Sequence, residues 1–374
     1  MTTEIPSHEP ARRPTVLFRA DGSGHVGFGH LVRCSTLARE FKDAGLRVLL
    51  ATRRPGGFPQ WVTDLFPGEI HELEGPGDPV LEQAGPSSHA DWLGTSQGED
   101  ADQLLELLDR LDMERVEYLI VDHYGIDETW HRRVRPFCRK LVAIDDLADR
   151  GMDVDVLLDQ NRSPEQAAVD YGERLPSKAV LLAGPHWSLI RREFRDHRGE
   201  PRTTNPEVPR VLVIMGGSDP DELTSDVIQS LTGIDPPLDV TVVIGQPDQL
   251  ERLESMREST DHSLHIRVAE TQMASLMARA DFAISAAGST VWELCCIGVP
   301  MVLLATEANQ QAVVQQAQTV GAAVRLPEVQ PGAVSAIIGA MLKEGGRMEA
   351  MSHAGRELVD GGGARRVSEV ILSP

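Results

Sequence analysis

The sequence predicts an α/β protein built from two Rossmann-like domains, each a doubly wound parallel sheet, which face each other across a cleft. The chain has 374 residues, too many for one ordinary core and about the number expected for two. Each half opens with a buried strand, a glycine-rich loop and a helical pattern. A polar, proline-rich segment at 195–209 lies between the halves and is the predicted linker.

The composition narrows the class of protein. Hydrophobic residues make up 41% of the chain and charged residues 25%, which excludes the disordered and fibrous classes. The formal net charge of −21 would repel a polyanion, so we expect neither nucleic acid nor a membrane among the partners. A small anionic ligand is compatible with this charge, because backbone amides in a loop can bind phosphate.

The cysteines and the apolar runs indicate the compartment. Cys34, Cys138, Cys295 and Cys296 have neither CxxC nor metal-ligand spacing, so we expect no disulfide framework and no zinc site. Residues 1–13 lack the apolar segment of a signal peptide, and no apolar run reaches about 18 residues. These features favour a cytoplasmic protein without a membrane span.

The N-terminal domain is predicted over residues 14–200. Its expected elements are strands at 15–21 and 46–52 joined by a glycine-rich loop and a helix that ends at Gly45, then a helix around 102–112, a strand at 116–123, a short helix after Gly125 and a strand at 140–146. Strand, loop, helix and strand in this order predict a right-handed βαβ unit on a parallel sheet. Residues 75–102, rich in Gly, Pro, Ser and acids, are expected to form a surface insertion.

The C-terminal domain is predicted over residues 208–360, where the same pattern starts again. Its expected elements are a strand and glycine-rich loop at 210–220, a helix at 221–232, a strand at 238–245, a helix near 248–258, a strand at 265–270, a helix near 271–280, a strand at 282–285, a helix that ends at Gly298 and a strand at 301–305. Weaker helical patterns follow, and a helix at 364–372 is a candidate to return to the N-terminal domain. In open sheets of this kind, ligands bind outside the carboxyl ends of the strands.

The first glycine-rich loop, residues 21–30, contains a literal GxGxxG after a strand. Alone, that pattern indicates dinucleotide binding, and the arginines at 53–54 could receive a 2′-phosphate. In the dinucleotide fingerprint, however, the third glycine already lies in the helix, whereas residues 28–30 intervene here. We therefore favour a wider loop that presents His30 at the helix start, facing the cleft. A histidine there is a candidate general base; the alternative is a hydrogen-bonding role at the helix end.

Polar side chains also follow the next strands of the N-terminal domain. Asp122-His123-Tyr124 falls at the carboxyl end of a strand, where sites on open sheets form, although a turn at Tyr124-Gly125 explains the segment equally well. Asp145-Asp146 ends the following strand, where paired carboxylates either bind sugar hydroxyls or cap a turn. Asp153-Val154-Asp155 is a formal DxD motif, but a lone DxD in an acidic chain gives weak support for a metal-dependent transferase, and we expect no metal.

The loop after the first strand of the C-terminal domain, MGGSDP at 215–220, combines two signals. Ser218 or Asp219 as N-cap, with proline at the first helical position, predicts a helix start in purely structural terms. Gly216 and Gly217 also allow a diphosphate to approach the backbone at that helix N-terminus. Both interpretations can hold together, and Ser218 is counted with the two glycines as a predicted nucleotide contact.

A second loop, AAGSTVWE at 286–293, leads into another predicted helix. Thr290 and Glu293 match a capping box, which is a structural explanation for the glutamate. The functional interpretation gives Glu293 to the two ribose hydroxyls, because a carboxylate can accept both. The remaining predicted nucleotide contacts are Ala286, Gly288, Ser289 and Thr290 near the phosphates, and Asn309 and Gln310 after the next strand.

Over residues 15–310 the chain carries, in order, the motifs RADGSGHVGFGHLVRC, VDHYGID, AIDDLADR, LLDQN, LLAGPHWSLIRREF, MGGSDP and SAAGSTVWELCCIGVP. In order and spacing they resemble the UDP-2,4-diacetamido-2,4,6-trideoxy-altropyranose hydrolases of pseudaminic acid biosynthesis. The second half also looks like the GT-B glycosyltransferase that adds N-acetylglucosamine to lipid-linked muramyl peptide. The resemblance implies a GT-B fold, in which the segment like AAGSTVWE binds the nucleotide.

For activity, the resemblance implies an inverting, metal-independent cleavage of a UDP-sugar at the anomeric carbon, with water activated by His30 and with no cofactor. We expect UDP on the C-terminal domain and the sugar on the N-terminal domain. The predicted catalytic residues are His30, Tyr124 and Asp21, and the predicted sugar contacts are Arg19, Gly29 and Asp122.

Two alternatives to a hydrolase stay open. An inverting glycosyltransferase could use the same base to deprotonate a small acceptor, such as a nucleobase or a natural-product hydroxyl or amine. A nucleotide-sugar-binding module would hold the same ligand without turnover.

Overall fold

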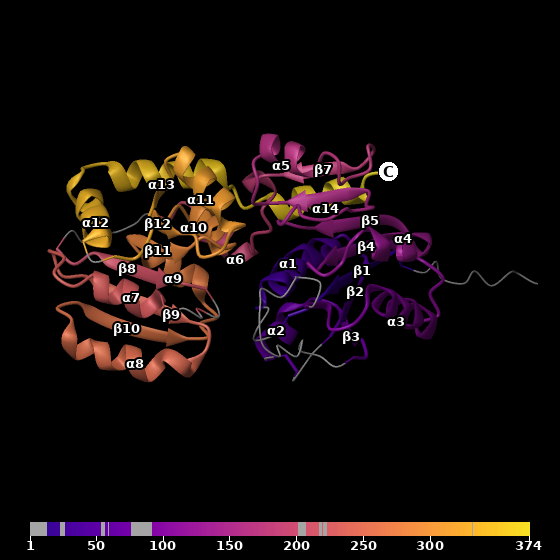
Figure 1. Cartoon of the computed structure of the whole chain (residues 1–374), viewed down its shortest axis with the longest axis horizontal. Helices are drawn as coiled ribbons and strands as arrows, with labels where there is room; N and C mark the ends of the chain where they lie inside the picture. The colour runs from indigo at the N-terminus through magenta and orange to yellow at the C-terminus, as the bar shows by residue number, and fades with distance from the viewer. Residues whose placement is uncertain are drawn as a thin grey trace, which may run out of the picture.

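The chain forms two α/β domains that lie side by side, each around its own parallel sheet (Figure 1). The structure is a computed structural model. It describes residues 13–22, 27–53, 57–58, 60–75, 92–200, 207–216, 219, 223–330 and 332–374.

The N-terminal sheet has seven parallel strands in the order β3-β2-β1-β4-β5-β6-β7. The strands are β1 (Thr15–Ala20), β2 (Arg47–Thr52), β3 (Glu69–Glu72), β4 (Val116–Asp122), β5 (Cys138–Ile144), β6 (Val156–Asp159) and β7 (Val180–Ala183). The helices are α1 (Gly29–Asp43), α2 (Gln60–Leu65), α3 (Gln97–Arg110), α4 (Glu128–Val134) and α5 (Pro164–Tyr171). Because the strand order changes direction between β1 and β4, the loops after these two strands border a crevice suited to a ligand.

The C-terminal sheet has six parallel strands in the order β10-β9-β8-β11-β12-β13. The strands are β8 (Arg210–Ile214), β9 (Asp239–Ile244), β10 (Ser263–Val268), β11 (Phe282–Ala286), β12 (Met301–Leu304) and β13 (Ala323–Arg325). The helices are α7 (Leu223–Ser230), α8 (Leu250–Ser255), α9 (Met273–Arg279), α10 (Thr290–Ile297), α11 (Gln310–Thr319), α12 (Ala333–Lys343) and α13 (Arg347–Leu358). Here the direction changes between β8 and β11, so the equivalent crevice lies beside the loops that precede α7 and α10.

Two helices connect the domains. The short α6 (Arg192–Asp196) follows the N-terminal domain, but its Phe194 is buried in the core of the C-terminal domain. The final helix, α14 (Gly363–Leu372), packs Val367 and Ile371 into the core of the N-terminal domain. Lys140 on β5 donates to the Ile371 carbonyl at 2.9 Å. In Figure 1 this yellow helix accordingly lies among the N-terminal elements, beside β5 and above α1.

The predicted fold class, two Rossmann-like parallel-sheet domains, is confirmed. The predicted end of a helix at Gly298 is also confirmed, since that glycine follows α10 with φ of 87°, a left-handed conformation that glycine adopts without strain. Strands β3, β6, β7 and β13 were not predicted, because runs of three or four residues give little periodic pattern.

The predicted surface insertion at 75–102 is wrong at its C-terminal end. Helix α3 already begins at Gln97, capped by the Ser96 hydroxyl, which accepts from the Glu99 amide at 3.2 Å. Its first turn carries Glu99 and Asp100, and acidic residues there favour a helix start as well as a loop. Asp100 is 0% exposed. Residues 76–91 of the predicted insertion lie outside the described residues.

Across the described part of the chain, no helix combines the length and the apolar character needed to cross a lipid bilayer.

Candidate active site

His30 and Asp122 meet at the crevice of the N-terminal sheet. His30 is the second residue of α1, and Asp122 is the last residue of β4, the strand next to β1. The two side chains are joined by a 2.5 Å contact between His30 Nδ1 and Asp122 Oδ1. An ionised carboxylate only accepts hydrogen bonds, so Nδ1 carries the proton and the lone pair lies on Nε2. A histidine held in this tautomer can accept a proton at Nε2.

Gly22 follows β1 and lies against the start of α1. A Cβ at that position would lie 2.7 Å from Leu31 Cδ1, so the end of that leucine side chain would have to shift to make room. The loop residues 23–26 lie outside the described residues. Gly29, a predicted sugar contact, is the first residue of α1, and its ideal Cβ has no neighbour within 4 Å among the residues that the structure describes.

Arg33 holds the carboxylate of Asp122 from the next turn of α1. Its Nε donates to Oδ2 and its second terminal nitrogen to Oδ1, both at 2.6 Å. Asp122 is 0% exposed. Burial by itself would raise the pKa of Asp122, but the charge of Arg33 and the contact with His30 outweigh it and hold this pKa below its usual range. Asp122 therefore stays ionised behind the imidazole.

Tyr124 and Asp146 complete the surroundings of His30. The Tyr124 ring meets the His30 ring edge-on, with centroids 4.6 Å apart, and its hydroxyl donates to Asp146. Arg33 also donates to Asp146, at 3.3 Å. Burial and the neighbouring Asp146 carboxylate raise the pKa of Tyr124 well above its usual range. Tyr124 is thus a neutral phenol that packs against the imidazole.

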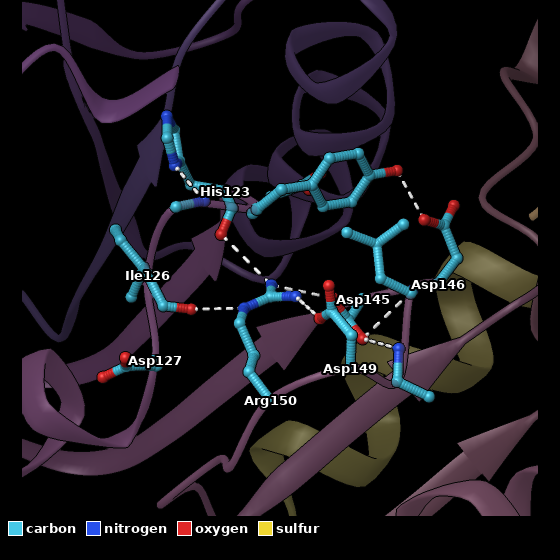
Figure 2. Close-up of polar contacts among 12 residues, drawn as sticks. His123, Ile126, Asp127, Asp145, Asp146, Asp149 and Arg150 are labelled. Carbon is cyan, nitrogen blue, oxygen red and sulfur yellow. Dashed lines mark hydrogen bonds and ion pairs between the residues drawn. The ribbon is translucent and has the colours of Figure 1, made fainter. Parts of the chain in front are cut away.

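Arg150 ties the loop of Tyr124 to the loop of Asp146 (Figure 2). Its Nε donates to the Ile126 carbonyl at 2.7 Å, and its terminal nitrogens pair with Asp145 and Asp149, each at 2.8 Å. Figure 2 shows the guanidinium between the two loops. The paired carboxylates of the sequence motif therefore divide their roles: Asp145 binds Arg150 and caps a turn at Ala148, whereas Asp146 faces Tyr124.

A second buried ion network lies beside β1. Arg19 is 0% exposed and donates to Asp21 at 2.5 Å and to Asp100 at 2.6 Å. Asp100 also accepts from Arg53 and from the Trp130 indole, both at 2.9 Å. The network fills the space between β1, β2 and α3 with matched charges, as buried ions require.

These contacts bear on several predicted roles. Arg19 and Asp122 are fully buried in the structure, and the sugar contacts predicted for them stay predictions. Asp21 uses its carboxylate on Arg19 and on the Arg53 amide, and the charge of Arg19 outweighs burial and lowers the pKa of Asp21 far below its usual range. The Asp21 carboxylate is thus already engaged within the network, and the catalytic role predicted for it stays a prediction. Arg53 is likewise taken by Asp100, which leaves it unsuited to a 2′-phosphate and removes that support for a dinucleotide site.

The loop before α7 keeps part of its predicted geometry. Asp219 caps the helix by accepting from the Leu223 and Thr224 amides at 2.9 and 3.0 Å. Gly216 has φ of 98°, and no atom of the described residues lies within 4 Å of its ideal Cβ. Gly217 and Ser218 lie outside the described residues. The backbone at Gly216 is thus open to a ligand, as a phosphate contact requires.

The loop before α10 resolves one alternative. Its N-cap is Ser289, without a side-chain hydrogen bond, so the capping box of Thr290 and Glu293 is not formed. Glu293 instead accepts from Arg191 at 3.3 Å, and its side chain is 16% exposed. Burial raises the pKa of Glu293, and Arg191 opposes that shift. The capping-box explanation for the glutamate therefore fails, and its side chain lies against Arg191, the residue just before α6.

The other predicted nucleotide contacts line the same edge of the C-terminal sheet. Ala286 ends β11, and within the described part of the chain no atom lies within 4 Å of the ideal Cβ of Gly288. Asn309 is the N-cap of α11. Gln310 folds back onto its own loop, where it accepts from the Thr306 amide at 2.9 Å.

Sequence reasoning missed Arg33 and Arg191. Arg33 follows His30 by three residues, the spacing that places two side chains on one face of a helix, and this signal was available. Arg191 precedes α6 in the linker region, and its contact with Glu293 spans 102 residues of sequence. No local pattern reveals such a pair.

Among the described residues, no group of three or more His, Cys, Asp or Glu side chains could hold a metal ion. The DxD motif has another partner, since Arg135 donates to Asp155 at 3.0 Å and to Asp153 at 3.4 Å.

Comparison with known proteins defines the class of fold first. Residues 211–361 match the family described as Glycosyltransferase family 28 C-terminal domain. The structure of Acinetobacter baumannii MurG aligns over 96% of this chain and 99% of its own, with TM-score 0.65 and 15% identity. CalG4, the calicheamicin glycosyltransferase, aligns over 97% and 100%, with TM-score 0.62 and 16% identity. The chain has the GT-B fold.

Curated sequences give more particular similarities. The chain is 25% identical to the protein MJ1062 of Methanocaldococcus jannaschii over 290 residues, 76% of this chain and 54% of the relative. It is 26% identical to UDP-2,4-diacetamido-2,4,6-trideoxy-beta-L-altropyranose hydrolase of Campylobacter jejuni over 217 residues, 58% and 65% of the two chains. It is 28% identical to the spore coat polysaccharide biosynthesis protein SpsG of Bacillus subtilis over 196 residues, 51% and 58%. The match thus spans less than two thirds of each relative.

The Arg19 network should make stability depend on acid. Burial opposes ionisation of Asp100, but Arg19 outweighs it and lowers the pKa of Asp100 below its ordinary 3.8. Below that pH the unfolded chain takes up a proton that the folded chain does not, so the free energy of unfolding should fall as the pH drops through 3.8 and toward the folded pKa. Asp100→Asn should cost about 3 to 5 kcal/mol at pH 7, and this difference should shrink with acid.

Urea unfolding of both proteins between pH 2 and 7 measures the effect. Asp102→Asn is the matched control, because Asp102 lies on the same helix but its side chain is 48% exposed. A wild-type stability for Asp100→Asn at pH 7 would show that the network contributes nothing.

Proposed function

We propose that this chain cleaves the anomeric C–O bond of a UDP-sugar with inversion, using water activated by His30, and releases UDP and a free amino or deoxy sugar. The Asp122–His30 pair carries the proposal. It lies at the crevice of the N-terminal sheet and holds the imidazole in the tautomer of a general base. The similarity to the Campylobacter hydrolase supports the same class of reaction.

The chemistry needs few groups. Water oxygen forms a bond to the anomeric carbon while the bond from that carbon to the diphosphate oxygen breaks, and UDP leaves with the electron pair. His30 Nε2 takes the proton that water loses. Asp122 stabilises the imidazolium that results, and the Tyr124 ring keeps the imidazole in place. Because a diphosphate is a weak base, the leaving group needs no general acid.

The C-terminal domain would hold UDP. In this proposal the backbone at Gly216, Gly217 and Ser218 and the loop Ala286–Thr290 bind the diphosphate, since helix N-termini favour anions. Glu293 accepts the ribose hydroxyls, while Asn309 and Gln310 border the nucleotide. Arg191 then lies beside the ribose through its contact with Glu293.

A glycosyltransferase is the second candidate, and a specific observation favours it. The matched family and the aligned structure of CalG4 are glycosyltransferases by name. The same His30 could deprotonate the hydroxyl or amine of a small acceptor in place of water, with the same bond broken and the same UDP released. The identity of the nucleophile separates the two candidates.

His30→Asn should lower kcat by about a hundred- to ten-thousandfold, because the variant lacks the nitrogen that accepts the proton. UDP affinity should stay nearly unchanged, because the proposed nucleotide contacts lie on the other domain. Assays of UDP release over time measure kcat, and calorimetric titration with UDP measures the affinity. His265→Asn on the exposed surface of β10 is the control. Normal turnover in the His30 variant would remove the catalytic assignment.

Glu293→Ala should weaken UDP binding by about 1.5 to 3 kcal/mol, because a charged acceptor of the ribose hydroxyls is lost. Titration with UDP measures the change, and titration with inorganic diphosphate should show no comparable loss. Glu293→Gln retains the size and hydrogen-bonding ability of the side chain but not its charge. Its UDP affinity should therefore lie between those of the wild type and Glu293→Ala. Wild-type UDP affinity in the alanine variant would limit Glu293 to its contact with Arg191.

The reaction in labelled water identifies the bond that breaks. With UDP-2,4-diacetamido-2,4,6-trideoxy-β-L-altropyranose as the first substrate, oxygen-18 should appear on the sugar, and the first-formed anomer should be inverted. Turnover should also survive EDTA. Label on phosphate, with release of UMP and dependence on magnesium or manganese, would instead indicate a metal-dependent diphosphatase. Free sugar that forms only slowly until an acceptor is added would favour the transferase.

A further inference from the structure

Asn161, two residues after the end of β6, bonds both domains at once. Its side-chain nitrogen donates to Asp146 at 2.8 Å. Its side-chain oxygen accepts from the Trp292 indole on α10 at 2.8 Å. Its main-chain carbonyl accepts from Gln316 on α11. Asn161 is 8% exposed and Trp292 0% exposed, so these bonds are shielded from water.

The chemistry of the two side-chain partners fixes the orientation of the amide. The Asp146 carboxylate accepts hydrogen bonds, and the Trp292 indole only donates. An amide satisfies both, with its nitrogen toward Asp146 and its oxygen toward Trp292. Aspartate at this position would set a second negative charge against Asp146, and an apolar residue would leave both partners unsatisfied.

The local backbone holds Asn161 in place. Asp159, the last residue of β6, accepts from the Asn161 amide at 2.8 Å and from the Arg162 amide at 3.0 Å. The Arg162 and Tyr171 side chains bind the same carboxylate at 2.8 and 3.1 Å. The turn that presents Asn161 is therefore rigid on the side of the N-terminal domain.

From Asn161 a continuous series of contacts reaches His30. Asp146 accepts from Arg33 and from the Tyr124 hydroxyl. Arg33 in turn holds Asp122, which orients His30. At the other end, Trp292 directly precedes Glu293 on α10. The helix proposed to hold the ribose is thus bonded, through one asparagine, to the groups that hold the base.

We propose that Asn161 is a positioning residue that fixes the C-terminal domain against the His30 network, so that a sugar attached to UDP on α10 reaches the imidazole in register. The structural part of this inference concerns only the placement of the domains; the catalytic part rests on the proposed function. Arg191, just before α6, also contacts α10 through Glu293, but Glu293 is the side chain proposed to bind the ribose. The Asn161–Trp292 bond uses none of the proposed ligand contacts.

Spin labels on the two domains test the placement without any assay of activity. Cysteines introduced at the exposed positions Glu106 on α3 and Glu251 on α8 carry the labels, since the four native cysteines are buried. The double variant Trp292→Phe/Gln316→Ala keeps the aromatic ring but removes both donors to Asn161. We expect its distance distribution to be shifted or broader than in the otherwise wild-type protein.

Arg192→Ala is the matched control. Arg192 on α6 pairs with Glu40 and Asp43 on α1, at 2.8 and 2.5 Å, which also joins parts of the two domains but lies outside the network. This variant should retain the wild-type distribution. An unchanged distribution in the double variant would overturn the inference, whatever reaction the protein catalyses.

Kinetics test the consequence for the reaction. Trp292→Phe should lower kcat by about ten- to a hundredfold, as a small displacement of the reacting groups does, with UDP affinity unchanged. Asn161→Ala removes this bond and also the bond to Asp146, so it should lower kcat at least as much. The two effects should not add when combined, because the bond that Trp292→Phe removes is already absent from Asn161→Ala. Additive effects, or a loss confined to thermal stability with normal kcat, would overturn the positioning role. A different outcome would separate the two proposals. If His30→Asn had normal turnover but the double variant Trp292→Phe/Gln316→Ala still had a shifted distance distribution, the proposed function would be wrong and the inference about domain placement would remain.

Discussion

The two-point bond between Arg33 and Asp122 is the constraint on which the site depends. It keeps a fully buried carboxylate charged, and only a charged carboxylate fixes the His30 tautomer with its lone pair on Nε2. The same guanidinium reaches Asp146, which anchors Tyr124. Without Arg33, the buried Asp122 carboxylate would lose its guanidinium partner, and burial would then favour its protonated form. The charge of Asp122 and the tautomer of His30 therefore both depend on Arg33.

The GT-B fold supplies the place for this arrangement but not its chemistry. The change of strand direction between β1 and β4 puts the ends of two neighbouring strands at one crevice, and α1 begins after the loop that follows β1. Neighbours with this fold include enzymes of different names at 11 to 17% identity, so the fold alone distinguishes no reaction. The distinction lies in the side chains at the strand ends, above all His30, Asp122 and Tyr124.

The sequence predicted what depends on local pattern. The βαβ units, the position of His30 at a helix start and the C-cap at Gly298 follow from periodicity and backbone preference within about ten residues of each other. The buried ion networks were not predictable, because Arg19 meets Asp100 and Asn161 meets Trp292 only through the tertiary fold. Asp100 shows the limit most plainly: in an acidic, glycine-rich neighbourhood a charged residue indicates a solvated loop, and nothing local shows that two arginines and an indole surround it.

The return of α14 to the N-terminal domain has a consequence for the order of folding. Val367 and Ile371 belong to the same apolar cluster as Phe18 and Phe41, near the start of the described chain. During synthesis that face of the first domain stays uncovered until residues 363–372 have left the ribosome, by which time the second domain is complete. The N-terminal domain is thus synthesised before the C-terminal domain, but its core is completed after it. Until α14 packs, the N-terminal domain exposes apolar surface of the kind that chaperones bind.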